Sequence, residues 1–370
     1  MSRLHGIVLT PHGFVDGMLD LTDKGRVDSV SGVAISEEAA MDSGRALILP
    51  GFIDLHVHGA GGADVMEGGE AAARISEVHA RHGTTSMLAT TMTAPMVDLV
   101  HAMSALTGIC QQRAKGGARI LGVHLEGPYI NDARLGAQPA FARPVASEEL
   151  TVLNQLAPIK LITMAPEVPG NMEIIESLCT QGYRVQIGHS SGRYEDGVMA
   201  LAKGAGGFTH LFNAMTPLHH RDPGMVGAAL AHAKYAEIIP DLIHVHPGAI
   251  RVALRAIPCL YCVSDSTSAT GMQDGEYKLG SHTVYKCLGA VRLADGTLAG
   301  STLTLDQALR NLVHSLGLSL REASKRVSTH AADYMGLADR GRLETGAWAD
   351  VVVLDAALNI QAVYVEGEKV

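Results

Sequence analysis

The sequence has few of the features that mark nucleic-acid-binding or membrane proteins. Only 4% of its 370 residues are aromatic and one is Trp, so stacking platforms for single-stranded nucleic acid are not expected. The 38 acidic residues outnumber the 29 basic ones, giving a net charge of −9. An acidic chain without a basic block is a poor partner for nucleic acids or anionic membranes. No run of 18 apolar residues occurs, so we expect no membrane span.

Cysteine is also scarce. The five cysteines are an odd number in a long chain, which argues against a disulfide framework. Cys259 and Cys262 have the spacing of a redox or zinc motif, but they lie in the apolar run 257–263 and no second pair is present. We predict a buried strand there, with a metal or redox role as the alternative. The first residues lack the pattern of a signal peptide, so the default location is the cytoplasm.

The two ends of the chain resemble each other in pattern. Short strand-like runs occupy residues 6–9 and 32–35, and similar runs recur at 349–354 and 360–365. Neither end is large enough to enclose a core of its own. We therefore predict that residues 1–49 and 338–370 pair into one small β-sandwich domain.

The middle of the chain, residues 50–337, alternates strands and helices. Helical patterns at 70–82, 171–181, 249–257 and 304–316 separate the apolar runs, Asn171 being the expected cap of the second, and a capping box at Ser319 and Glu322 opens a further helix. Eight alternating strands predict an α/β fold, a (β/α)8 TIM-type barrel. An open doubly wound sheet is the alternative, but no G-x-G-x-x-G follows the first strand. The eight predicted strands are 52–58, 84–90, 120–126, 159–165, 185–189, 207–210, 238–244 and 260–265.

Polar side chains close several of these strands, at the end where barrel enzymes assemble their active sites. Because strand side chains alternate, His56 and His58 face the same way. His124 faces the same way as Glu126 one layer deeper, so we assign it to the barrel interior rather than to a ligand set. Imidazoles and carboxylates together are ligands for a divalent metal ion. The strand-end residues are His56, His58, Glu126, His189, His210 and Asp265.

The motifs that carry these residues resemble the amidohydrolase superfamily. Within it they are most similar to the branch that deacetylates N-acetylated hexosamine 6-phosphates. The resemblance covers the chain from about residue 48 onward. Its most specific motifs are His-Leu-Glu-Gly-Pro at 124–128, His-Leu-Phe-Asn-Ala-Met at 210–215 and His-His-Arg-Asp-Pro-Gly at 219–224.

The resemblance implies roles for the strand-end residues. Glu126, His189 and His210 match the ligands of a metal ion that all members keep. His56 and His58 match a pair that holds a second ion in some members, so one or two ions are expected. Zn²⁺ is the first choice, with Fe²⁺, Mn²⁺ or Co²⁺ as alternatives.

Further roles implied by the resemblance concern catalysis and substrate. Asp265 matches the general base that then acts as general acid. His244 and Arg221 match residues that bind the sugar phosphate, and the Arg reaches in from a neighbouring subunit, so a homodimer is implied. Either residue could instead be structural: Arg221 as a surface residue before Pro223, and His244 within its strand. His246 points the other way on that strand and is not assigned.

The resemblance also implies positions that hold the sugar. Asn213 and Ala214 match substrate-holding positions, and Thr302 lies in a loop that closes over the sugar in relatives.

Gln138 marks a departure from the family pattern. Most relatives have a His at this place, which donates to the substrate carbonyl. An amide N–H can still donate, although it cannot be cationic. We expect Gln138 to do the same work more weakly; a changed acyl sugar is the alternative.

The expected reaction is removal of acetate from N-acetylglucosamine 6-phosphate, with the galacto epimer or another N-acylated anion as the alternative. A ring-opening amidohydrolase is disfavoured because such enzymes carry a modified Lys at the end of strand four, where this chain has Met164, Ala165 and Pro166. A catalytically inactive scaffold is disfavoured because no ligand position is lost.

Overall fold

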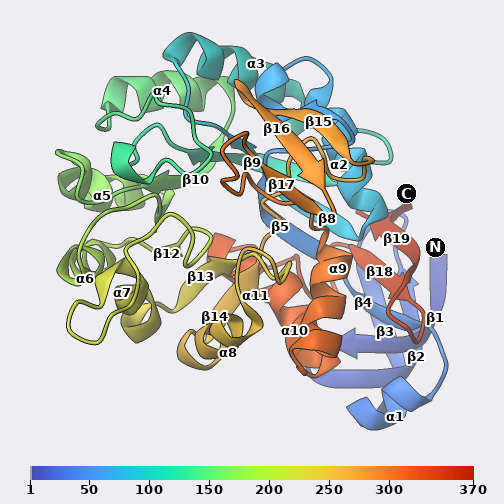
Figure 1. Ribbon diagram of the computed structural model, residues 1–370. Coiled ribbons are helices and arrows are strands. Elements are labelled where there is room, and N and C mark those ends of the chain that lie inside the picture. The colour runs from blue at the N-terminus through green and yellow to red at the C-terminus, as the bar shows by residue number, and fades with distance from the viewer. Residues whose placement is uncertain (1) are drawn as a thin grey trace.

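The computed structural model describes residues 2–370, and it divides into a barrel and a smaller sheet beside it (Figure 1). Strands from both chain ends form the smaller sheet, as expected. Its seven strands are hydrogen-bonded in the order β20-β19-β18-β4-β1-β2-β3. The first four in sequence are β1 (Ser2–Thr10), β2 (Gly13–Leu21), β3 (Val27–Ile35) and β4 (Leu47–Pro50). The last three are β18 (Val351–Leu354), β19 (Ile360–Val365) and β20 (Glu368–Lys369).

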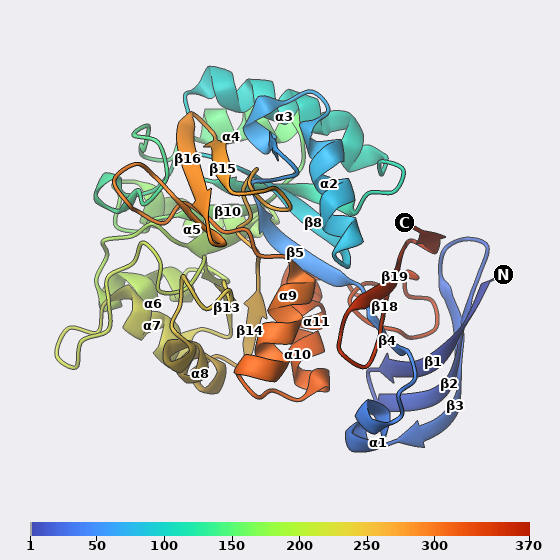
Figure 2. The same ribbon diagram turned by 45° about the vertical axis from the view of Figure 1, so that its right-hand side comes forward.

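The seven-stranded sheet joins the two chain ends through β4. This strand pairs in parallel with β1 on one side and antiparallel with β18 on the other. The sheet has its own apolar core, which includes Val8, Leu19, Ile48 and Val351. Figure 2 shows it standing to one side of the barrel, with α1 (Glu37–Asp42) at its edge.

The predicted (β/α)8 barrel is confirmed, and the open doubly wound sheet is therefore excluded. Six of the parallel strands are hydrogen-bonded in one sheet, and β13 pairs with β14. A bridge between Val57 and Ser266 connects the segment after β14 back to β5, which closes the circle. The eight strands are β5 (Phe52–Val57), β8 (Thr84–Thr91), β9 (Arg119–Glu126), β10 (Ile159–Met164), β11 (Arg184–Ile187), β12 (Gly207–Phe208), β13 (Tyr235–Ile238) and β14 (Cys259–Cys262).

Helices cover the outside of the barrel. The four helices whose limits were predicted lie close to those limits, and the helix expected after Ser319 is present; the others were not placed individually. The helices between strands are α2 (Ala71–Arg81), α3 (Met96–Gln111), α4 (Ser147–Leu156), α5 (Asn171–Thr180), α6 (Tyr194–Ala202), α7 (Gly224–His232) and α8 (Pro247–Ala256). After β14 follow α9 (Leu305–Arg310), a wider turn of π-helix (Asn311–Ser315), α10 (Leu320–Val327) and α11 (Thr329–Met335). Within residues 2–370, no helix combines the length and apolar character needed to cross a bilayer.

Two details at helix starts differ from the expectation. Asn171 does not cap α5: it is the first helical residue, and its buried amide donates to the carbonyls of Tyr129 and Ala165. Ser319 does cap α10 by accepting from the Glu322 N–H, but the Glu322 carboxylate pairs with Lys325 instead of completing the box.

The predicted seventh strand was placed too late in the sequence. β13 ends at Ile238 because Pro240 has no N–H for the ladder and Asp241 starts a turn. The Asp241 carboxylate accepts from the N–H groups of Ile243 and His244. His244 and His246 are therefore not strand residues; His246 instead caps α8 by accepting from the Gly248 N–H.

A small antiparallel sheet between β14 and α9 was not predicted. It consists of β15 (Gly275–Leu279), β16 (His282–Cys287) and β17 (Ala290–Arg292). It lies over one end of the barrel in Figures 1 and 2. The chain that returns from it, residues 297–300, contributes to the cavity described below.

Candidate metal centre and active site

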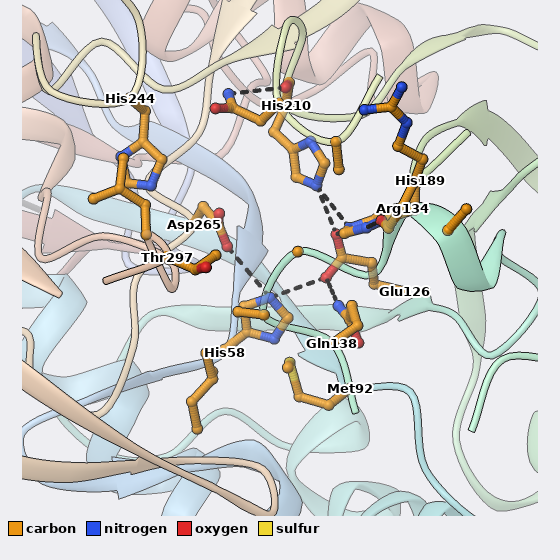
Figure 3. A pocket seen from close by; sticks show the side chains of 18 residues that line it. His58, Met92, Glu126, Arg134, Gln138, His189, His210, His244, Asp265 and Thr297 are labelled. Atoms are coloured by element: carbon orange, nitrogen blue, oxygen red, sulfur yellow. Dashed lines mark hydrogen bonds and ion pairs between the residues drawn. The ribbon is translucent and has the colours of Figure 1, made fainter. Parts of the chain in front are cut away.

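The predicted strand-end residues meet at the carboxyl end of the barrel. His56 and His58 come from the end of β5, Glu126 is the last residue of β9, and the others lie just beyond β11, β12 and β14. All but His56 line a cavity of about 350 Å³, shown in Figure 3. That volume is in the range of small-molecule sites, roughly 300–1,000 Å³.

Three of these residues have an unusual backbone conformation. His189, His210 and Asp265 have φ values of 49°, 28° and 49°, in the left-handed region that non-glycine residues rarely adopt. Such conformations cost on the order of 1–3 kcal/mol each and persist where the surroundings enforce them, most often at functional sites. Each follows a barrel strand directly, so the bend redirects the side chain into the cavity.

Glu126 lies at the centre of the cluster and is 1% exposed. Its Oε1 is 3.2 Å from His189 Nε2 and 3.0 Å from His210 Nε2. Its Oε2 is 3.3 Å from His56 Nε2 and 3.1 Å from His58 Nε2. One carboxylate thus offers a different oxygen to each pair of imidazoles.

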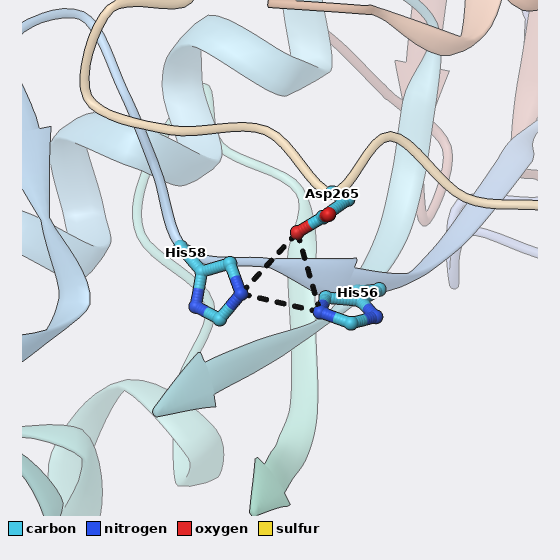
Figure 4. Close-up of side chains that lie close together, drawn as sticks. All are labelled: His56, His58 and Asp265. Atoms are coloured by element: carbon cyan, nitrogen blue, oxygen red, sulfur yellow. Dashed lines mark hydrogen bonds and ion pairs between the residues drawn. The ribbon is translucent and has the colours of Figure 1, made fainter. Parts of the chain in front are cut away.

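Asp265 completes the group on the His56 side (Figure 4). Its Oδ1 is 3.4 Å from His56 Nε2 and 3.3 Å from His58 Nε2, and these two nitrogens are 3.2 Å apart. Among residues 2–370, three groups each have their ligand atoms within 4.8 Å of one another: His56/His58/Asp265 and Glu126/His189/His210 at the cavity, and His56/His124/Glu237. Imidazole nitrogens converging on carboxylate oxygens are the donor set of a divalent transition metal, so the residues fit such an ion.

The charges in the cluster shift the pKa values of its members. Burial disfavours the imidazolium of His58, but hydrogen bonds to Asp265 and Glu126 outweigh it and raise the pKa of His58 to about 9. Burial also opposes ionisation of Glu126, yet the charge of His56 and hydrogen bonds from neighbouring imidazoles hold its pKa well below the usual value. Burial likewise opposes ionisation of Asp265, but the charges and hydrogen bonds of His56 and His58 lower its pKa to about 2.

The raised pKa of His58 predicts that metal uptake depends on pH. An ion can bind only the neutral imidazole, so it must displace a proton from any His58 that is charged. Below about pH 9, each fall of one unit is expected to weaken binding roughly tenfold for each proton displaced. Calorimetric titration of the metal-free protein with Zn²⁺, in two buffers of different ionisation enthalpy, measures this release. Binding at neutral pH without proton release would contradict the expectation, and His58→Asn should release fewer protons.

Gln138 is buried and touches the cluster. Its Nε2 donates to Glu126 Oε2 over 2.7 Å, and its Oε1 accepts from the Thr93 N–H over 2.7 Å. The Thr93 contact fixes the orientation of the amide. One Nε2 hydrogen is used by Glu126, and the second is available to a ligand in the cavity.

The predicted substrate-side residues fall into two groups. Asn213, Ala214 and His244 line the cavity, and Asp241 Oδ2 lies 2.6 Å from His244 Nδ1, so that Nε2 is left to face a ligand. Arg221 and Thr302 do not line it. Arg221 is exposed and its Nη1 donates to His220 Nε2; the Thr302 hydroxyl donates to the Gly289 carbonyl.

Three residues of the site were missed by the sequence analysis. Glu237, near the end of β13, is buried with its Oε2 3.0 Å from His56 Nδ1. Arg134 lines the cavity, and its carbonyl lies 2.8 Å from His189 Nδ1. Thr297 lies at the cavity rim. Glu237 would have been found had β13 been placed correctly; Arg134 ends a single 3₁₀ turn (Asp132–Arg134) and Thr297 lies in a loop, so neither has a periodic signal.

His124 lies in the barrel interior, as predicted, and Cys259 and Cys262 lie on a strand, as predicted. His124 is buried, and its Nε2 lies 2.7 Å from the Thr163 hydroxyl. Its pKa is held well below the usual value by burial and by the charge of His56. Cys259 and Cys262 lie on β14 as free cysteines, and neither belongs to a ligand group among residues 2–370.

Comparison with known proteins gives consistent matches over nearly the whole chain. The model of the amidohydrolase family matches residues 47–370. An N-acetylgalactosamine-6-phosphate deacetylase of Escherichia coli O157:H7 is 36% identical over 98% of this chain and 97% of its own. An N-acetylglucosamine-6-phosphate deacetylase of Lysinibacillus sphaericus is 38% identical over 86% of this chain and 84% of its own.

Solved structures give the same result. The N-acetylglucosamine-6-phosphate deacetylase of Thermotoga maritima superposes with a TM-score of 0.91 at 31% identity, covering 100% of this chain and 99% of that one. A mutant of the Mycobacterium smegmatis enzyme, in complex with N-acetyl-D-glucosamine-6-phosphate, has the same score, identity and coverage.

Proposed function

The chain belongs to the amidohydrolase family, and we propose that it removes acetate from N-acetylglucosamine 6-phosphate to leave glucosamine 6-phosphate. The observation that carries this proposal is the pair of adjacent ligand groups, His56/His58/Asp265 and Glu126/His189/His210, with Glu126 Oε2 also beside His56 and His58 and with Asp265 lining the same cavity. The solved relative that binds N-acetyl-D-glucosamine-6-phosphate has the same fold over the full chain.

We propose that one or two divalent ions, Zn²⁺ in the first instance, are held by Glu126, His189 and His210 and by His56 and His58. A metal bound there supplies a water of lowered pKa and polarises the amide carbonyl. Asp265 takes the proton from the water and then delivers it to the leaving amine, which leaves poorly unless protonated. Its Oδ1 lies beside both imidazoles of the His56 group, on the wall of the cavity.

The phosphate and sugar are proposed to lie toward the cavity rim. In its doubly protonated form, His244 can donate from Nε2 to a phosphate oxygen while Nδ1–H donates to Asp241. Arg221 is exposed and does not line the cavity of its own chain. Its exposure supports a role in the active site of a neighbouring subunit, across a homodimer interface. Asn213 and Ala214 line the cavity and are proposed to hold the sugar. Thr302 does not line the cavity, where Thr297 and Gly300 lie instead, so its proposed contact with the sugar has less support.

We propose a cytoplasmic enzyme, in keeping with its five free cysteines.

The galacto epimer is the second candidate substrate, because a relative named for that reaction matches 98% of this chain. Acetate release from both phosphorylated epimers, and from unphosphorylated N-acetylglucosamine, tests both proposals with metal supplied. Turnover of a phosphorylated sugar without turnover of the free sugar supports the reaction and the phosphate site, and the rate ratio assigns the epimer. No turnover of any of the three would overturn the proposed function.

Gln138→Ala is expected to lower kcat more than it raises KM. If the second Nε2 hydrogen donates to the substrate carbonyl as charge develops, its loss should lower kcat by roughly 10²–10³-fold. The matched variant Gln138→His restores a donor and should recover most of the rate. Steady-state acetate release measures both variants, and an unchanged kcat in Gln138→Ala would contradict the assignment.

A further inference from the structure

A chain of buried hydrogen bonds runs around the barrel interior beneath the metal centre. Seven side chains take part, and each belongs to a different barrel strand or to the residue just after it. All are 0% exposed. We refer to them as the interior chain: Thr90, His124, Thr163, Thr209, Gln186, Tyr261 and Glu237.

One end of the interior chain is an acceptor that fixes the direction of its nearest bonds. Glu237 Oε2 accepts from the His210 N–H over 3.1 Å and lies 3.0 Å from His56 Nδ1. As a carboxylate it can only accept, so the Tyr261 hydroxyl donates to Oε1 over 3.4 Å. Because that hydroxyl proton is used, Tyr261 accepts from Gln186 Nε2, 2.5 Å away.

The same reasoning identifies the donor and the acceptor in each of the remaining hydrogen bonds. Gln186 Oε1 accepts from the Thr209 hydroxyl over 3.0 Å, so Thr209 must accept from Thr163 over 2.7 Å. Thr163 has then used its proton and accepts from His124 Nε2–H over 2.7 Å. A neutral His124 consequently has no proton on Nδ1, which accepts from the Thr90 hydroxyl over 3.4 Å.

The other end of the interior chain is a donor. The Val57 N–H donates to Thr90 Oγ1 over 2.8 Å, which agrees with the direction derived from Glu237. The direction is set at the Glu237 end, because a carboxylate can only accept, and the Val57 N–H is compatible with it. The chain therefore determines the tautomer of the imidazole that it contains.

We infer that Glu237 is a positioning residue of the metal centre: together with the interior chain it keeps a proton on His56 Nδ1, so that Nε2, beside His58 and Asp265, is the nitrogen that gives up its proton and offers a lone pair to an ion. The inference rests on the proposed metal-dependent function. It assigns to Glu237 the role that a carboxylate behind a ligating imidazole plays in metal sites, where it fixes the ring and raises its basicity.

Glu237→Gln tests the inference with little change in shape. Its amide oxygen can still accept from the His210 N–H, which places the amide N–H₂ toward Tyr261. Tyr261 then has no acceptor at residue 237, and we expect its proton to go to the oxygen of a reoriented Gln186 amide. The chain beyond it reverses, and the His124 proton moves from Nε2 to Nδ1. This shift is visible by ¹⁵N NMR of labelled protein, with the His124 signals assigned from a His124→Gln sample.

The second readout is metal affinity. Loss of the carboxylate behind His56 should weaken the ion of the His56/His58/Asp265 group by roughly 10–100-fold, and the Glu126/His189/His210 group should keep its ion. The matched control is Asp54→Asn. Asp54 is equally buried, but its Oδ1 accepts only from the N–H groups of His56 and Ser264, and an amide oxygen preserves both bonds.

Wild-type affinity for both ions together with an unchanged His124 tautomer in Glu237→Gln would overturn the inference. A thermal melt shows whether the variant is folded, and if it is not, Tyr261→Phe provides the tautomer measurement, because it removes the hydroxyl through which Glu237 sets the orientation of the Gln186 amide. Failure of the proposed function would look different. The wild-type protein would then release no acetate or bind no ion, whereas the His124 tautomer would still report the direction of the interior chain.

Discussion

Replacing Asp265 with Asn is expected to lower kcat for acetate release by roughly 10²–10⁴-fold, the range for loss of a positioned general base. The amide keeps the size of the carboxylate but cannot take a proton from water or pass one to the leaving nitrogen. Asp265 is well placed for both steps, because it is 9% exposed, lines the cavity and lies beside the imidazoles of His56 and His58.

The Asp265→Asn measurement must separate lost chemistry from lost metal, since Asp265 belongs to one of the two ligand groups at the cavity. Rates are therefore compared at saturating metal, with bound metal determined on the same sample. Asp306→Asn is a suitable control, because Asp306 pairs with Arg310 on α9, outside the metal centre. A variant that retains its metal and works within tenfold of the wild type would show that another group moves the proton.

Replacing Glu126 with Gln is expected to remove both ions and reduce acetate release to background. Each oxygen of Glu126 faces a different pair of imidazoles, so one substitution affects both ligand groups at once. Removing one partner from a buried charged cluster leaves the remaining groups without compensation, at a cost of about 3–5 kcal/mol. A substitution of a ligand that belongs to only one group, such as His189→Asn, should weaken the binding of one ion more than that of the other.

Metal analysis after gel filtration measures this effect directly. The wild type should carry up to two ions per chain, and Glu126→Gln should carry none at metal concentrations that saturate the wild type. Glu149→Gln serves as the control, because Glu149 pairs with Arg143 away from the cluster. Full metal content in Glu126→Gln would show that the histidines alone are sufficient ligands.

The barrel and most of the candidate metal ligands were predictable, because the sequence patterns that indicate them each lie within a few consecutive residues. Short apolar runs ended by His, Glu or Asp mark the strands, and alternation sets the direction of His56 and His58. Glu237 was missed for an equally local reason. The apolar run from Ile238 onward suggested a strand there, although Pro240 cannot contribute to a ladder. The hairpin of β15 and β16 also left a signal, since Gly280 and Ser281 form a two-residue turn between alternating segments.

Contacts between distant residues were not predictable from the sequence. The position of Gln138 was identified, but its two hydrogen bonds depend on where Thr93 and Glu126 lie in three dimensions. The interior chain joins residues of seven strands, and no spacing in the sequence relates them. Such pairings are fixed by barrel register, which emerges only when the circle closes between Val57 and Ser266.

The position of β4 between strands from opposite ends of the chain affects how the protein can fold as it is synthesised. The β1–β2–β3 meander can pair as soon as it emerges, because its contacts are local. The other edge of β4 must wait for β18, since Pro50 pairs with Val351, a residue roughly 300 positions later, and such distant pairings form slowly. Until then the growing chain presents one unpaired edge of an apolar strand. Such an edge can pair with another chain, so this stage of synthesis is the one most exposed to association between nascent chains.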